Sequence, residues 1–430
     1  MRKVLLLFFL FIVIEFVHAQ NTISLKDSLA DYFAEIKNST EHKQELWGIN
    51  LYGPMLLVNP ATREVYANYP DSAGLLKADH SLYSGTLPVT INISNTSVHW
   101  SGRDWAMIML PLPKDKITRV ILLAHELFHR SQKRLGYFPY NPDNNHLDQK
   151  DGRIYLRLEL EALKKAFMSS TSSEMHKHIG NALTFRNYRH QLYAGSDSTE
   201  NRMELNEGIT EYSGFMVLGI SGNEAARHFI NNINAFLTDK SYVRSFAYQT
   251  IPVYGYLLSR QKKDWHRSVN ANTNLTDLFS AAFNVHSPAD AAAVCKNIAA
   301  QYDGTKIISE ENKREEDLKK LIAAYKSKFI EQPHFDIFLE KMNISFDYRI
   351  IMPLEDKGTV YPKIRVTDKW GILDVSNGSL MSPAWNNITV SAPVKFDGNK
   401  ISGDGWILEL NEKYTIEKNT ATGNYSLKQK

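Results

Sequence analysis

The sequence predicts an α+β protein with a strand-rich N-terminal part, a helical middle and a small all-β domain at its C-terminal end. Three observations support this prediction. Residues 55–110 hold short apolar runs bounded by turn residues. Residues 116–328 hold apolar residues mostly at helical spacing. Residues 348–427 return to short strands separated by glycine-containing turns.

Composition limits the classes of protein that are possible. The chain has 430 residues, of which 43% are hydrophobic and 23% charged, as in globular proteins with two or three domains. The net charge of +3 gives no reason to expect nucleic acid as a partner. The single cysteine, Cys295, has no partner for an internal disulfide.

The first residues have the pattern of a secretory signal peptide. Arg2 and Lys3 form a basic start, residues 4–17 are almost wholly apolar, and Val17-His18-Ala19 fits a cleavage site. An uncleaved membrane anchor is the alternative, but the apolar stretch is shorter than the roughly 20 residues that cross a bilayer. We therefore expect residues 1–19 to be removed, leaving a periplasmic or secreted chain without a membrane span.

The N-terminal part of the mature chain shows one helix and several strands. Apolar spacing predicts a helix over residues 25–36, and two apolar runs around a turn predict a hairpin of residues 55–58 and 64–67. Strict alternation predicts a strand over residues 89–93. Residues 105–110 read as a further strand, which we expect to be able to pair with an extended peptide.

The next helix contains the motif H-E-x-x-H. At 3.6 residues per turn, His125 and His129 lie one turn apart on one face, so both imidazoles can reach one metal ion. Glu126 is rotated about 100° from His125 around the helix axis. This position suits a carboxylate that binds a metal-bound water better than one that acts as a third ligand. Asp115 is expected to cap the start of this helix, and Gly136 its end.

Two later helices carry carboxylates that could complete a metal site. On a helix over residues 153–167, Glu159 falls on the apolar stripe, where a buried carboxylate needs a partner. A helix from residue 203 to about 218 has three glutamates at spacings of three and four, which places them on one face. They are Glu204, Glu207 and Glu211.

The two motif helices resemble those of the gluzincin metallopeptidases, the clan of thermolysin and aminopeptidase N. In that clan a downstream N-E-x-x-x-D/E motif follows H-E-x-x-H, and the segment from Asn206 to Tyr212 matches it. The resemblance implies a zincin-like catalytic domain in which His125, His129 and Glu207 bind Zn²⁺. It also implies that Glu126 is the general base and that Glu211 orients a ligand histidine. Glu159 remains the alternative third ligand.

These observations predict an exported zinc-dependent metallopeptidase that hydrolyses peptide bonds of a peptide or protein substrate. The alternatives are a zinc hydrolase of a non-peptide amide or ester, and a non-catalytic, zinc-stabilised binding protein. Tyr254 is the chosen catalytic donor for the developing oxyanion, from a set that also holds Tyr248, Tyr256 and His190. The expected organisation is a signal peptide over 1–19, a catalytic domain over 20–330 and a β-rich accessory domain over 345–430.

Overall fold

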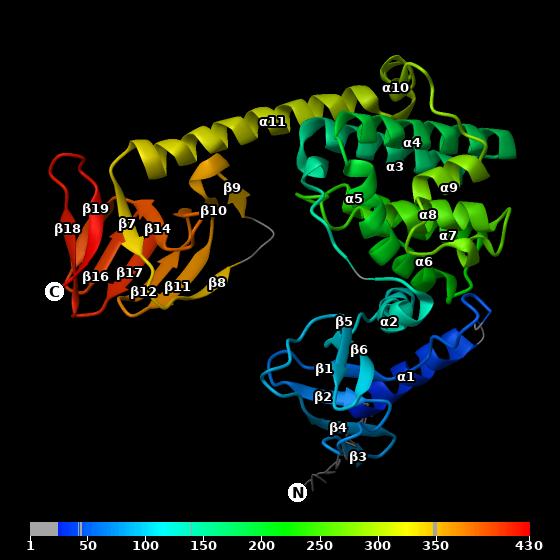
Figure 1. Ribbon diagram of the computed structural model, residues 1–430, viewed down its shortest axis with the longest axis horizontal. Coiled ribbons are helices and arrows are strands. Elements are labelled where there is room, and N and C mark those ends of the chain that lie inside the picture. Colours follow the sequence, from blue (N-terminus) through cyan, green and yellow to red (C-terminus); the bar gives the residue numbers. More distant parts are fainter. Residues whose placement is uncertain (1–24, 42, 44, 139, 347–350) are drawn as a thin grey trace, which may run out of the picture. The chain divides into compact units, whose positions relative to one another are not determined.

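The computed structural model describes residues 25–41, 43, 45–138, 140–346 and 351–430 (Figure 1). The predicted signal peptide, residues 1–19, lies outside these ranges. Within them the protein is a mixture of helices and strands with a β-rich C-terminal region, as predicted. None of the helices in the described ranges has the length and apolar character needed to cross a membrane.

The chain forms two compact units that interleave along the sequence. The first unit is made of the described residues within Met1–Asp143, together with Gly195–Phe236 and Ser245–His286. The second is made of Asn144–Ala194, Leu237–Arg244 and the described residues within Ser287–Lys430. The two long helices between the motifs, Lys150–Met168 and Ser172–Leu192, thus belong to a different unit from the motifs themselves. The predicted domain boundaries remain a prediction.

The first unit contains a six-stranded sheet in the order β3-β4-β2-β1-β6-β5. The predicted hairpin is confirmed as the antiparallel pair β1–β2, while β1 and β6 run parallel. β1 is buried along its whole length, which explains its uninterrupted apolar run. The strands are β1 (Met55–Val58), β2 (Glu64–Ala67), β3 (Lys77–Asp79), β4 (Leu82–Thr86), β5 (Thr96–Trp100) and β6 (Arg103–Met109).

The strand predicted over residues 89–93 is wrong. Residues 89 and 90 form a turn, and the next strand begins only at Thr96. The Arg63 side chain donates hydrogen bonds to the carbonyls of Leu87 and Ile91, so a guanidinium group takes the place of a neighbouring strand. The alternating pattern has another cause: Ile91 and Ile93 of this loop pack on the sheet's core without ladder pairing, while Val89 is exposed.

Seven α-helices of the first unit accompany this sheet within the described residues. The predicted caps of α2 are confirmed: the Asp115 carboxylate accepts from the Thr118 N–H, and Gly136 ends the following 3₁₀ turn with φ 81°. The helix predicted from residue 203 is longer and is interrupted by a π-helical turn, Glu204–Gly208. The helices and segments are α1 (Leu25–Glu41), α2 (Lys116–Gln132), α5 (Ser196–Met203), α6 (Ile209–Met216), α7 (Gly222–Phe236), α8 (Ala247–Ser259) and the short α9 (Leu275–Ala282).

In the second unit, four helices precede a β-rich region. The α3 and α4 helices pack along each other, and α11 packs on α3. Arg153 on α3 and Glu311 on α11 form a buried ion pair at 2.8 Å that ties these two helices together. The helices are α3 (Lys150–Met168), α4 (Ser172–Leu192), α10 (Ala291–Ala299) and α11 (Gly304–Lys326).

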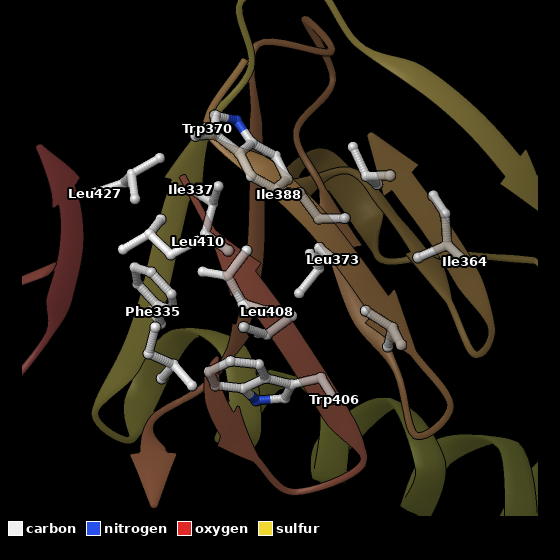
Figure 2. Packing of buried hydrophobic residues seen from close by; sticks show 14 of the residues in the cluster. Phe335, Ile337, Ile364, Trp370, Leu373, Ile388, Trp406, Leu408, Leu410 and Leu427 are labelled. Atoms are coloured by element: carbon white, nitrogen blue, oxygen red, sulfur yellow. The ribbon is translucent and has the colours of Figure 1, made fainter. Parts of the chain in front are cut away.

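Two sheets enclose the core of the β-rich region, whose strands begin at His334 (Figures 1 and 2). Their orders are β18-β19-β7-β14-β13-β10-β9 and β15-β16-β17-β12-β11-β8. Both contribute to one apolar cluster that includes Phe335, Trp370 and Trp406 (Figure 2). The indole N–H of Trp370 donates to the Phe338 carbonyl at 2.8 Å, so this buried ring leaves no polar group unsatisfied.

These strands are short and follow one another closely. The bounds are β7 (His334–Phe338), β8 (Asn343–Phe346), β9 (Met352–Pro353), β10 (Thr359–Tyr361), β11 (Ile364–Asp368), β12 (Gly371–Val375), β13 (Ser379–Met381), β14 (Asn387–Ser391), β15 (Pro393–Asp397), β16 (Lys400–Gly403), β17 (Trp406–Leu410), β18 (Tyr414–Lys418) and β19 (Tyr425–Gln429).

Candidate metal centre

Three side chains of the first unit converge on one point. The Nε2 atoms of His125 and His129 on α2 lie 3.0 Å apart. The Oε2 atom of Glu207 lies 3.5 Å from the first of these nitrogens and 3.3 Å from the second. One ligand atom from each residue falls within 4.8 Å of the others, so these three groups could hold a single metal ion.

Glu207 reaches this point from the π-helical turn between α5 and α6. There the Ile209 N–H bonds to the Glu204 carbonyl, five residues back. The extra residue in the turn separates Glu204 from the other two glutamates, which corrects the expectation that all three share one face. The Glu204 carboxylate is buried and accepts a hydrogen bond from the Thr250 hydroxyl at 2.7 Å.

Two glycines allow the helices around the site to approach closely. A Cβ atom on Gly214 would lie 2.9 Å from the Ile121 carbonyl oxygen, so only glycine lets α6 pack this tightly on α2. A Cβ atom on Gly208 would lie 2.7 Å from the Ile251 Cβ, which sets how closely α8 meets the π-helical turn. Gly208 is the glycine of the N-E-G sequence, so its presence has a packing reason.

The hydrogen bonds of the second ring nitrogens fix the tautomer of each histidine. Nδ1 of His125 lies 2.9 Å from Oε2 of Glu211. Because an ionised carboxylate only accepts hydrogen bonds, Nδ1 carries the proton and donates it. Nε2 of His125 is then left to face the Glu207 carboxylate.

Gln132 does the same for His129. Its amide nitrogen donates to the Asn206 carbonyl at 2.9 Å and to the Thr210 hydroxyl at 3.1 Å, which identifies its other atom as the oxygen. That oxygen lies 2.8 Å from Nδ1 of His129 and accepts its proton. Gln132 belongs to none of the motifs described above; its position three residues after His129, one helical turn on, was the available signal.

Two neutral imidazoles held in this way would point two lone pairs at a carboxylate. Burial by itself would lower the pKa of His125, but its hydrogen bonds to Glu207 and Glu211 raise it to about 10. Burial would raise the pKa of Glu207, but the two histidines and the Tyr248 hydroxyl hold it well below its ordinary value. The site therefore favours added positive charge among these ligand atoms, which is what a divalent cation supplies.

Glu126 lies beside the three converging groups with one oxygen unused. Its side chain is 4% exposed, and its Oε2 atom makes no hydrogen bond within the described part of the chain. Burial raises the pKa of Glu126 above its ordinary value, while the neighbouring histidines oppose that rise. A buried, unpaired carboxylate oxygen of raised basicity is suited to taking a proton from a water and giving it back.

Tyr248, and not Tyr254, is the tyrosine at this site. Tyr254 is fully buried and stacks on Phe279 with ring centroids 5.2 Å apart, so its assignment as the catalytic donor does not fit its position. The Tyr248 hydroxyl donates to Oε2 of Glu207 at 2.6 Å, and its ring stacks on His125 at 5.5 Å. Burial, together with the nearby Glu207 carboxylate, raises the pKa of Tyr248 and keeps it a proton donor.

Glu159, the alternative third ligand, forms ion pairs with two arginines away from the converging groups. Its two carboxylate oxygens accept hydrogen bonds from Arg186 at 2.8 Å and Arg189 at 2.7 Å, and all three side chains are fully buried. A carboxylate held between two guanidinium groups has its charge compensated without a metal. Among the described residues, the cluster that could hold an ion contains Glu207 and excludes Glu159.

The converging groups line an open cavity of about 610 Å³. Its wall includes residues 95–97, where strand β5 begins. β5 is the edge strand of the sheet, whereas β6 is paired on both sides. The expectation that residues 105–110 pair with a peptide is therefore corrected: the free edge belongs to β5.

A substitution of Glu211 tests whether the hydrogen-bond partners of the histidine Nδ1 atoms matter for metal binding. Replacing Glu211 by alanine removes the acceptor that orients His125, and we expect zinc affinity to fall by about ten- to a hundredfold. Competition with a chromophoric chelator measures this change. Glu224→Ala, which removes an exposed glutamate of α7, is the control. Equal zinc affinity of the Glu211 variant and the wild type would contradict the assigned role.

Comparison of the chain with protein-family models, with curated proteins and with solved structures gave no match. The chemistry of the site therefore rests on its own residues.

Proposed function

We propose that the protein is a zinc-dependent hydrolase of peptide bonds. The observation that carries this proposal is the convergence of His125 Nε2, His129 Nε2 and Glu207 Oε2. Their outer hydrogen bonds leave each histidine with a lone pair directed inward. Two imidazoles and one carboxylate form a typical three-ligand set of catalytic zinc sites, which keep a further position open.

The proposed chemistry divides between the cation and the chain. Zinc at these ligands would polarise a substrate carbonyl and lower the pKa of a water molecule. Glu126 would take a proton from the attacking water through its oxygen that has no hydrogen bond, and the water oxygen would bond to the carbonyl carbon. Glu126 would then give that proton to the leaving amine as the carbon–nitrogen bond breaks. The Tyr248 hydroxyl, whose single proton is now donated to the Glu207 carboxylate, would turn away from it to donate to the oxygen that gains negative charge.

A peptide substrate is favoured by the strand that borders the cavity. Residues 95–97 lie in the cavity wall at the start of the edge strand β5. An extended peptide can add to such an edge through main-chain hydrogen bonds, which brings its carbonyl groups past the candidate metal ligands. We extend the proposal to a zincin-like, gluzincin-type catalytic unit and to export directed by residues 1–19.

Metal removal and return test the proposal directly. We expect the full chain to cleave members of a mixed peptide pool, to lose this activity after treatment with a chelator, and to regain it with one equivalent of zinc. Mass spectrometry of the pool detects new peptide ends. Chain that binds one zinc with all three ligands and cleaves no peptide would refute peptidase activity while leaving the metal centre intact.

A further inference from the structure

We infer that a second pocket beside the metal centre binds a bulky apolar side chain of the substrate and favours a nearby acidic group. This inference rests on the proposed function, because it assigns specificity to the same catalytic site. The pocket has a volume of about 260 Å³. Its lining residues are Tyr137, Phe138, Tyr140, Arg202, Leu205, Asn206, Ala271 and Asn272.

The pocket adjoins the catalytic cavity through one shared residue and one pair of sequence neighbours. Asn206 lines both spaces and immediately precedes the ligand Glu207. On the other side, Tyr140 lines the pocket while the next residue, Asn141, lines the cavity. A substrate lying over the metal ligands can therefore place one of its side chains in the pocket.

The shared residue Asn206 has a hydrogen-bond acceptor to spare. Its amide nitrogen donates to Oε1 of Glu207 at 2.8 Å and to Oδ1 of Asn141 at 2.6 Å. Because a carboxylate can only accept, the nitrogen of Asn206 must face Glu207, and the remaining atom is Oδ1. Asn206 is only 5% exposed, and this oxygen is buried. It has no hydrogen-bond partner in the described part of the chain.

A buried acceptor without a partner costs free energy, so a ligand that donates to it gains affinity. A peptide N–H group is such a donor, and Asn206 lines both spaces. Asn206 thus has two roles in this arrangement. Its nitrogen positions Glu207, and its oxygen binds the main chain of the substrate.

The walls of the pocket define which side chain fits. Three aromatic residues and Leu205 supply apolar surface, and the pocket contains no carboxylate among the residues that line it. Phe138 and Tyr140 remain 77% and 56% exposed, so a bound apolar group would cover surface that now faces water. An aromatic or large aliphatic side chain matches this lining.

The charge of the pocket comes from Arg202 alone. Its guanidinium carbon lies over the Tyr140 ring, 5.5 Å from the ring centroid. No ion pair joins Arg202 to a carboxylate within the described residues. A guanidinium group held against a ring keeps its N–H donors available in the plane, where they can bind a carboxylate of the ligand.

Peptide cleavage by variants of the full, zinc-loaded chain tests the inference. Leu205→Trp fills the pocket, and Leu205→Met keeps its volume. Arg202→Glu reverses the charge at an exposed position that is expected to tolerate it, and Lys263→Glu makes the same change at an exposed lysine that lines neither space. The substrates are matched peptides that vary between phenylalanine and alanine, and between glutamate and lysine, at positions flanking the cleaved bond.

We expect the wild type to prefer phenylalanine over alanine at one flanking position by about tenfold, and Leu205→Trp to abolish that preference. We expect Arg202→Glu to shift the ratio of glutamate to lysine peptides toward lysine by about threefold or more, because an exposed charge acts weakly. Lys263→Glu should match the wild type, and Leu205→Met should keep the preference for phenylalanine because it keeps the volume of the pocket. Unchanged preferences in Arg202→Glu, together with unchanged preferences in folded Leu205→Trp, would overturn the inference.

A binding measurement separates failure of the inference from failure of the proposed function. If the wild type cleaves no peptide, peptidase activity fails, and the pocket is tested with 3-phenylpropanoate on the zinc-free full chain by ligand-observed NMR. Binding that Arg202→Glu removes and Lys263→Glu retains supports the pocket. Absence of binding, or binding that Arg202→Glu leaves unchanged, overturns it.

Discussion

Replacing Glu126 by glutamine is expected to leave zinc bound and to lower peptide hydrolysis by roughly a thousandfold. The substitution keeps the size of the side chain and changes its proton chemistry, because an amide cannot take a proton from water. The three proposed ligands are untouched, so metal content should stay near one per chain. Elemental analysis measures the zinc, and kcat/KM on a cleaved peptide measures the activity.

The matched control for this variant is Glu45→Gln, which makes the same change at an exposed position that does not line the cavity. Its activity should equal that of the wild type. Full turnover by Glu126→Gln would show that a different group accepts the water proton. Loss of zinc from this variant would instead show that Glu126 supports the metal, and the loss of activity would then say nothing about a base.

Replacing Glu207 by alanine is expected to remove zinc from the chain. This change deletes one of three proposed ligands. The affinity for zinc should therefore fall by more than the ten- to about a hundredfold expected for Glu211→Ala. Without the carboxylate, His125 and His129 also lose the group that both approach within 3.5 Å. Zinc per chain after dialysis, measured by elemental analysis, checks the expectation.

Two further variants sharpen that experiment. Glu204→Gln changes a buried glutamate of the same π-helical turn and keeps an oxygen for the Thr250 hydroxyl, so it should retain zinc. Glu159→Gln removes the charge between two buried arginines and should lower the free energy of unfolding by about 3 kcal/mol. If folded Glu159→Gln loses zinc while Glu207→Ala keeps it, the proposed ligand set is wrong.

Local patterns predicted much of the fold. The spacing of apolar residues located α2, and its caps at Asp115 and Gly136 were correctly placed because a cap depends on its nearest neighbours in sequence. The hairpin β1–β2 was likewise predicted from two apolar runs and a turn. Alternation over residues 89–93 wrongly predicted a strand. The Arg63 side chain, distant in sequence, donates hydrogen bonds to carbonyl groups that would otherwise bond to a partner strand.

The sequence by itself determined the pair His125 and His129 and the base candidate between them, because residues four apart on a helix necessarily share a face. Only the tertiary structure decided the rest. Glu207 lies 78 positions after His129 (207 − 129), and its approach depends on helix contacts that the motif does not encode. The choice of Tyr248 over Tyr254 and the hydrogen bond between Asn206 and Asn141 also follow from packing between distant segments. Such contacts are set by the whole fold, and no local spacing predicts them.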